Sequence, residues 1–97
     1  MDDIIYYNDL YDLYSGLLTE KQRLYFENYY FDNLSFAEMA ENYNVSRNAV
    51  FKQLKITKDR LEEYERILKL LEKKKIVEKI VDNLEDKTIK AQLDNLF

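Results

Sequence analysis

The feature that most restricts the fold of this chain is its lack of residues that bend the backbone. Its 97 residues include no proline and a single glycine, Gly16. Proline and glycine shape most tight turns, bulges and sharp loops, because proline fixes φ and glycine tolerates positive φ. The second half of the sequence is rich in Glu, Lys and Leu, which are good helix formers. We therefore expect an all-α fold.

The length and the hydrophobic content of the chain predict one packed domain over residues 1–97. A chain of this length is well above the roughly 40 residues below which a fold usually needs disulfides, metals or partners. Hydrophobic residues make up 46% of the sequence, and nine Tyr and five Phe contribute large apolar surfaces. Segments that stay disordered lack such residues, so we expect a hydrophobic core.

The sequence lacks the residue types on which most small catalytic and metal sites depend. Neither cysteine nor histidine is present, which excludes disulfides, thiolate nucleophiles, imidazole bases and the common zinc-binding patterns. Acidic pairs such as Glu62 and Glu63 are adjacent in sequence and would not converge on one helix face. No glycine-rich phosphate loop is present either. We expect a protein that is not an enzyme, with no catalytic residue, no metal and no cofactor.

The N-terminus and the hydropathy pattern favour a cytoplasmic protein without membrane insertion. The chain opens with Met1-Asp2-Asp3, whose negative charge is opposite to that of a signal peptide. No apolar run approaches the roughly 18 residues that span a bilayer. A reducing compartment also suits a chain without cysteine.

Charge is distributed unevenly along the chain, although the net charge is only −4. Residues 1–45 contain nine acidic side chains against Lys21 and Arg23, a net charge of −7. Residues 46–60 contain five basic side chains against Asp59, a net charge of +4, and the remaining residues carry −1. A local basic segment is typical of a surface that binds nucleic acid, whereas the acidic first half would oppose the approach of DNA.

Apolar spacing and capping residues predict the first two helices. Residues 4–14 place apolar side chains at mostly three- and four-residue intervals, and Ser15-Gly16 ends this helix. Thr19 followed by Gln22 matches a capping box, in which each side chain satisfies an unpaired backbone N–H at a helix start. A second helix therefore runs from this box to about Phe31.

A helix-turn-helix is predicted over residues 35–54. Ser35 and Glu38 repeat the capping-box pattern and begin a short helix. Ala40 supplies the small residue that is needed where the second helix of the motif crosses the first. Asn44 permits the turn, because Asn tolerates the left-handed backbone conformation better than other residues that have a side chain.

Ser46 is expected to cap a long helix over residues 46–73, since no glycine or proline interrupts that range. Along this helix apolar positions recur at alternating steps of four and three, the spacing of a coiled coil. The later residues of this stripe must be buried in the core of the chain or in the seam of a homodimer; they are Leu61, Tyr64, Leu68 and Leu71. We favour a homodimer, because two paired helix-turn-helix units bind DNA more tightly and recognise a longer DNA sequence than one unit does. Short C-terminal helices are expected over residues 76–96.

The exposed side chains of the second helix of the motif are the candidate DNA-binding residues. They are Ser46, Arg47, Asn48, Phe51, Lys52 and Lys55. Arg can donate two hydrogen bonds to guanine, Asn can pair with adenine, Phe can contact a thymine methyl group and Lys can neutralise phosphates. The alternatives are that Arg47 forms a surface ion pair with Glu38 or Glu41 and that the motif packs helices without contacting DNA.

The segment Leu17–Leu70 resembles the YlxM-like family of small bacterial helix-turn-helix proteins. The resemblance is carried by the LLTEKQR opening, the aromatic-rich second helix, the NLSFAEMAENYNVSR core and the long helix that follows. More distantly, residues 19–54 resemble region 4 of bacterial sigma factors. Residues 46–50 match the family's Ser-Arg-Gln-Ala-Val motif, with Asn48 in place of Gln, and Phe51 stands where Tyr is common.

The resemblance implies a DNA-binding regulator associated with the signal recognition particle, because members of the family are encoded beside the GTPases of that particle. The alternative is an adaptor that binds protein or RNA components of the particle and does not bind DNA. The acidic first half of the chain favours a basic partner in that alternative.

Overall fold

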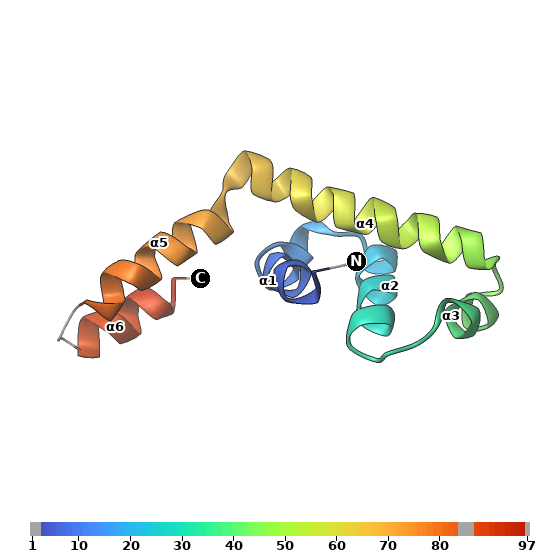
Figure 1. Cartoon of the computed structure of the whole chain (residues 1–97), viewed down its shortest axis with the longest axis horizontal. Helices are drawn as coiled ribbons and strands as arrows, with labels where there is room; N and C mark the ends of the chain where they lie inside the picture. Colours follow the sequence, from blue (N-terminus) through green and yellow to red (C-terminus); the bar gives the residue numbers. More distant parts are fainter. Residues whose placement is uncertain (1–2, 84–86, 97) are drawn as a thin grey trace.

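The computed structural model describes residues 3–83 and 87–96, and every regular element in these ranges is a helix. Along the chain the elements are α1 (Ile4–Tyr14), η1 (Ser15–Leu17), α2 (Glu20–Tyr30), α3 (Phe36–Tyr43), α4 (Arg47–Leu68), α5 (Leu70–Asp82) and α6 (Lys87–Asp94). Figure 1 shows α1, α2 and α3 on one side of α4, with α5 and α6 extending from its C-terminal end. The molecule measures 53 × 25 × 25 Å. The predicted all-α fold class with a helix-turn-helix is confirmed.

The two predicted capping boxes form at the starts of α2 and α3. The Thr19 hydroxyl accepts a hydrogen bond from the Gln22 N–H at 3.1 Å, and the Gln22 side chain accepts one from the Thr19 N–H at 2.9 Å. Ser35 and Glu38 form the same reciprocal pair at 3.0 and 3.1 Å. Each box satisfies two N–H groups that a helix start leaves unpaired. Both helices therefore begin where the sequence predicts.

Helix α4 contributes to both hydrophobic clusters of buried residues. The first cluster joins α1, α2, α4, α5 and the turn before α2; its buried members are Leu10, Tyr11, Tyr14, Leu18, Phe26, Leu61 and Leu71. The second cluster joins α2, α3 and α4; its buried members are Tyr25, Met39, Ala40, Val50 and Leu54. Burial of each large apolar side chain contributes roughly 1.5–3 kcal/mol. The orientation of α4 is thus fixed at both ends by packing.

The apolar stripe of the long helix is largely used within the chain. Leu61 and Leu71 are buried in the first cluster. Tyr64 is half-buried, and its hydroxyl donates a hydrogen bond to the carbonyl of Leu17 at 3.2 Å. Leu68 is 40% exposed. Residues of the same chain therefore cover much of the stripe that a homodimer seam would use.

The helix predicted over residues 46–73 is divided in the structure at Lys69. Helix α4 ends at Leu68 and α5 begins at Leu70, because Lys69 adopts a left-handed conformation with φ 55° and ψ 33°. That conformation costs roughly 1–2 kcal/mol for a residue with a side chain. Neither glycine nor proline marks the position, so the local sequence gives no sign of it.

A network of tertiary hydrogen bonds holds this division in place. The Glu65 carboxylate accepts hydrogen bonds from the N–H groups of Leu71 at 2.9 Å and Glu72 at 3.2 Å, and from the Tyr14 hydroxyl at 2.7 Å. The Tyr14 hydroxyl in turn accepts a hydrogen bond from the Leu70 N–H at 3.0 Å. The first N–H groups of a helix lack intrahelical partners, and a carboxylate there is favourable. Burial, followed by the hydrogen bond to Glu65, raises the pKa of Tyr14 to about 12, so its hydroxyl remains a hydrogen-bond donor well above neutral pH.

The C-terminal helices differ in their bounds from the sequence-based expectation. The helix expected from residue 76 begins at Leu70 instead, because the joint at Lys69 starts a new helix there. Helix α6 (Lys87–Asp94) lies within the predicted range 76–96 and returns alongside α5 (Figure 1). Residues 84–86 of that range lie outside the described residues.

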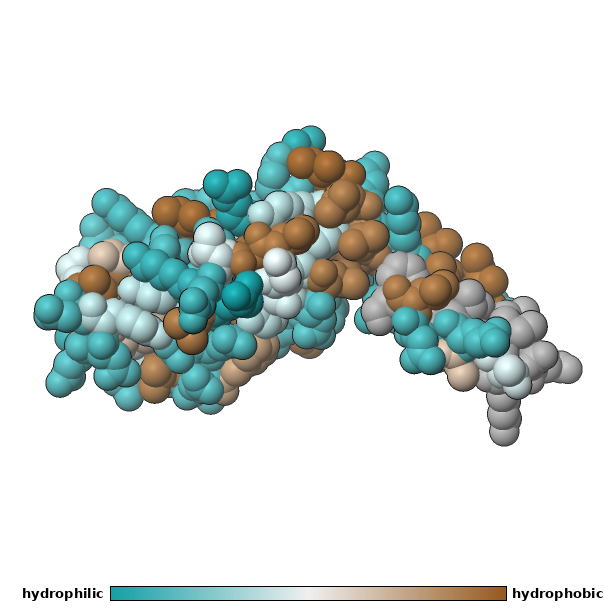
Figure 2. All heavy atoms as spheres, turned by 180° about the vertical axis from the view of Figure 1, so that it is seen from behind, coloured by the Kyte–Doolittle hydropathy of each residue, from teal (hydrophilic) through white to brown (hydrophobic). Residues whose placement is uncertain are grey.

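The face opposite to that of Figure 1 carries apolar side chains close to the corner between α4 and α5 (Figure 2). Ile67 and Leu68, the last residues of α4, are 60% and 40% exposed. On α5, Ile76 and Ile80 are 52% and 56% exposed. Apolar side chains that gather on a surface mark binding surfaces more often than isolated ones do.

Replacement of Glu65 by Gln is expected to destabilise the fold at the α4–α5 joint. Gln has one acceptor oxygen and no charge, so at least one N–H group at the start of α5 loses its partner. Loss of a hydrogen bond to a charged acceptor costs roughly 1.5–3 kcal/mol, and urea unfolding followed by circular dichroism measures the change. Glu63→Gln is the control, because Glu63 pairs with Arg66 on the surface of the same helix. An equal loss of stability in both variants would contradict the role given to Glu65.

Candidate nucleic-acid interface

Helices α3 and α4 are joined by a turn centred on Asn44. Asn44 is left-handed, with φ 55° and ψ 48°, as the sequence predicts for this residue. The Val45 N–H donates a hydrogen bond to the carbonyl of Ala40 at 3.0 Å, which satisfies a carbonyl at the end of α3. The Ser46 hydroxyl then accepts a hydrogen bond from the Ala49 N–H at 3.0 Å, so α4 begins immediately after Ser46.

The two helices of the motif pack on α2 through the second hydrophobic cluster. Ala40 of α3 and Val50 and Leu54 of α4 are buried together in this cluster. Tyr25 of α2 stacks on Tyr43 with ring centroids 4.6 Å apart, and burial raises the pKa of Tyr25. This packing decides which face of α4 is turned to the solvent.

All six residues that the sequence assigns to the DNA-binding face are exposed; they are Ser46, Arg47, Asn48, Phe51, Lys52 and Lys55. A helix turns by about 100° per residue. Asn48, Lys52 and Lys55 therefore lie on the side of α4 opposite the buried Val50 and Leu54. The remaining three residues lie at the start of the helix or on the flank of that side.

The six residues differ in whether their side chains contact other residues of the chain. Arg47, Asn48 and Lys52 form no side-chain hydrogen bond or ion pair with any residue in the described ranges. The alternative pairing of Arg47 with Glu38 or Glu41 is therefore not seen. Glu38 instead closes the capping box of α3.

The other three residues serve contacts within the chain, and the first of them is Ser46, whose hydroxyl caps α4. Lys55 pairs with Asp59 one turn further along α4, with an N–O distance of 3.6 Å. The Phe51 ring meets the Phe36 ring edge-on, with centroids 6.2 Å apart. Phe51 is nevertheless 51% exposed, so part of its ring is open to a ligand.

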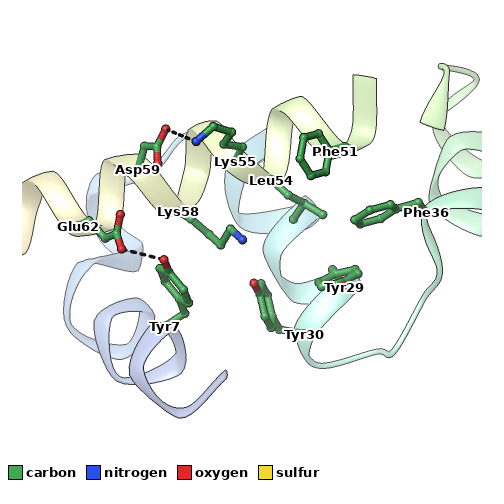
Figure 3. A pocket seen from close by; sticks show the side chains of 10 residues that line it. All are labelled: Tyr7, Tyr29, Tyr30, Phe36, Phe51, Leu54, Lys55, Lys58, Asp59 and Glu62. Carbon is green, nitrogen blue, oxygen red and sulfur yellow. Dashed lines mark hydrogen bonds and ion pairs between the residues drawn. The ribbon is translucent and has the colours of Figure 1, made fainter. Parts of the chain in front are cut away.

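A groove beside this face is a feature that the sequence analysis missed. It encloses about 620 Å³ among α1, α2, α3 and α4 (Figure 3). The lining residues are Tyr7, Tyr29, Tyr30, Phe36, Phe51, Leu54, Lys55, Lys58, Asp59 and Glu62. The aromatic run in α2 was the available signal, but the sequence pattern does not distinguish a ring in the core from a ring that lines a groove. That distinction depends on how four helices meet.

Two classes of site find no support in the part of the chain that the structure describes. None of its helices has the length and apolar character needed to cross a membrane. Its acidic side chains form no group of three or more placed to hold a metal ion. The described surface instead offers basic side chains, aromatic rings and hydrogen-bonding groups.

Comparison of the sequence with models of known protein families identifies the family of this chain. The family model described as "Putative helix-turn-helix protein, YlxM / p13 like" matches residues 1–96. The chain belongs to this family. The family resemblance seen in the sequence over residues 17–70 is confirmed and extends through α5 and α6.

Relatives in this YlxM / p13 like family, each called a UPF0122 protein, cover most of the chain. The relative from Shouchella clausii (strain KSM-K16) is 51% identical over 73 residues, which are 75% of this chain and 67% of that protein. The relative from Halalkalibacterium halodurans is 49% identical with the same coverage. The relative from Bacillus cereus (strain AH187) is 53% identical over 66 residues, which are 68% of this chain and 60% of that protein. The aligned part of the chain thus spans about two thirds of these relatives or somewhat less.

Replacement of Asn44 by Ala is expected to destabilise the helix-turn-helix, whereas Asn44→Gly is expected to leave its stability unchanged or higher. Ala adopts the left-handed conformation less readily than Asn, and Gly adopts it without steric cost. We expect a loss of about 1 kcal/mol for the Ala variant, measured by thermal unfolding. Equal stability of the Ala and Gly variants would contradict a left-handed turn at this position.

Proposed function

We propose that this protein binds double-stranded DNA, with the N-terminal half of α4 in the major groove, and that it acts by binding rather than by catalysis. The observation that carries the proposal is that Arg47, Asn48 and Lys52 are exposed and form no side-chain hydrogen bond or ion pair with the described residues. Arg47 begins α4, and Asn48 and Lys52 lie on the side of that helix opposite its buried face. Membership of a helix-turn-helix family supports the same function.

The side chains at the start of α4 have the chemistry that base reading requires. Arg47 can form two hydrogen bonds to a guanine edge, and Asn48 can do the same with adenine. Lys52 and Lys55 can neutralise phosphates, and the exposed part of the Phe51 ring can contact a thymine methyl group. The positive end of the helix dipole also favours a phosphate near Ser46.

The distribution of charge favours a protein that reads selected sites over one that coats DNA. The net charge of +4 over residues 46–60 attracts the DNA backbone locally, while the −7 of residues 1–45 repels it. Sequence-independent affinity comes mainly from phosphate contacts, so it is weak for an acidic protein. Base contacts must then supply a large share of the binding energy, as in a transcription regulator.

Replacement of Arg47 or Lys52 by Ala is expected to weaken binding to promoter-like duplexes. Loss of a base contact by Arg47 should cost roughly 1–3 kcal/mol and relax sequence preference, whereas loss of Lys52 should weaken binding to all sequences and lower the salt slope by about 1. Fluorescence anisotropy over a series of salt concentrations measures both effects.

Lys73→Ala is the control for the duplex measurements, since Lys73 is exposed on α5, outside the helix-turn-helix. Its affinity for the duplex should equal that of the parent chain. A parent chain that binds no duplex at low salt, or an Arg47→Ala variant with parental affinity, would reject the proposed DNA contact.

The acidic first half of the chain favours one second function, an adaptor for the signal recognition particle. Its net charge of −7 suits a basic protein partner, and the family resemblance links the chain to that particle. Recovery of the particle's protein or RNA by the tagged chain, unaffected by Arg47→Ala and Lys52→Ala, would favour this function over DNA binding.

A homodimer stays a prediction, and sedimentation equilibrium checks it. Since Leu61 and Leu71 are covered within one chain, pairing through the stripe would use Leu68 and the apolar surface near the α4–α5 corner (Figure 2). We expect twice the mass of one chain at high concentration and a return to the single-chain mass in Leu68→Lys, because a charge in an apolar interface opposes association. The mass of one chain at every concentration would remove the homodimer.

A further inference from the structure

The groove among α1, α2, α3 and α4 brings together rings and charged side chains, of which only Phe51 and Lys55 belong to the proposed duplex-binding face. Its volume of about 620 Å³ lies within the range of roughly 300–1,000 Å³ that is typical of sites for small ligands. Its walls differ in character (Figure 3): α1, α2 and α3 contribute aromatic rings, whereas α4 contributes Phe51 and all of the charged side chains. A suitable ligand therefore combines a planar apolar part with a charged part.

The aromatic wall presents rings that are only partly covered. Tyr29 and Phe36 are stacked with centroids 5.1 Å apart, and Phe51 meets Phe36 edge-on. Tyr29, Tyr30 and Phe36 are half-buried and Phe51 is exposed, so each ring retains accessible surface. Nucleobases bind to such surfaces by stacking, largely without regard to sequence, because every base has a planar face.

The wall formed by α4 carries two basic and two acidic side chains, and Lys55 is the basic one that lies one helical turn after Phe51. Lys55 pairs with Asp59 at 3.6 Å, and both side chains are mostly exposed to solvent, so the pair is weak and a phosphate can replace the carboxylate. Lys58 lies over the Tyr7 ring at 5.4 Å from its centroid. Glu62 accepts a hydrogen bond from the Tyr7 hydroxyl at 2.7 Å, which places this carboxylate at the α1 end.

We propose that this groove binds a nucleotide, with the base against Phe36 and Phe51 and the phosphate at Lys55. Stacking and phosphate neutralisation are the two contributions on which sequence-independent nucleotide binding rests. The charged side chains that line the groove sum to zero, but the net charge of +4 over residues 46–60 attracts an anion to this part of the surface. Because Phe51 and Lys55 also belong to the proposed duplex-binding face, occupation of the groove and binding of a duplex are coupled.

The nucleotide has two sources, a free mononucleotide and an unpaired nucleotide of a single strand. A base within a duplex presents its edges in the grooves and keeps its faces stacked, so the rings of Tyr29, Tyr30 and Phe36 add nothing to duplex reading. The groove site depends on the rings, whereas duplex reading depends on Arg47 and Lys52. An experiment can therefore disprove nucleotide binding in the groove without disproving duplex binding, and the reverse also holds.

A heteronuclear NMR titration of the full chain tests this proposal, with thymidine 5′-monophosphate and a short oligo-deoxythymidylate as separate probes that share base and sugar. We expect the amide resonances of Phe36, Phe51 and Lys55 to shift with at least one probe. A response to the mononucleotide alone identifies the free nucleotide as the ligand, and a response to the oligonucleotide alone identifies a single strand. A response to both supports a site that recognises the nucleotide unit.

Variants separate the groove from the rest of the surface. Phe36→Leu keeps an apolar side chain but removes the ring, and it is expected to weaken the probe's affinity roughly fivefold or more. Lys55→Gln should weaken binding severalfold and reduce its salt dependence. Phe31→Leu is the matched control, since Phe31 is an exposed ring just after α2 that does not line the groove. Arg47→Ala should also leave the groove affinity unchanged while it weakens duplex binding.

Two results would overturn the proposal. The first is the absence of shifts at these residues with either probe at millimolar concentration. The second is an affinity that remains unchanged in both Phe36→Leu and Lys55→Gln. Should Phe36→Leu unfold, Lys55→Gln still decides, because Lys55 is exposed and its replacement removes no buried contact.

Discussion

The burial of one face of α4 against two hydrophobic clusters positions the rest of the molecule. Val50 and Leu54 pack with α2 and α3, whereas Leu61 packs with α1 and α5. Thr57 lies fully buried within the same face, and its hydroxyl donates a hydrogen bond to the carbonyl of Gln53 at 2.9 Å, so its polar group is satisfied. Because both clusters hold one rigid helix of 22 residues, the solvent-facing side of that helix is set by contacts along its whole length.

The local elements were predictable, because each depends on a few neighbouring residues. The Thr19 and Ser35 boxes fix two helix starts, and Asn44 provides the left-handed turn. The exposure of Asn48, Lys52 and Lys55 followed from the same periodicity, since the burial of Val50 and Leu54 leaves the opposite side of α4 in contact with solvent. Sequence spacing and local hydrogen bonding are thus sufficient for the helix-turn-helix itself.

The features that the sequence did not reveal depend on residues that are distant in the chain. The break at Lys69 is stabilised by Tyr14 and Glu65, which are 51 positions apart, and no window of neighbouring residues contains both. The groove arises where four helices meet, so its rings and charges come together only after the chain is folded. The sequence also left open what covers the apolar stripe of the long helix, because spacing shows that a face must be buried but not which surface buries it.

Helices α5 and α6 form an arm whose direction is set at the Lys69 joint, so a small rotation at the joint displaces the far end of the arm. Helix α5 has 13 residues and is therefore about 20 Å long, so a rotation of roughly 10° at its base moves the far end by about 3 Å. The base is fastened through Tyr14 to α1 and through Glu65 to the end of α4. A molecule that binds to this arm and rotates it would thus act on α1 and α4, which also border the aromatic groove.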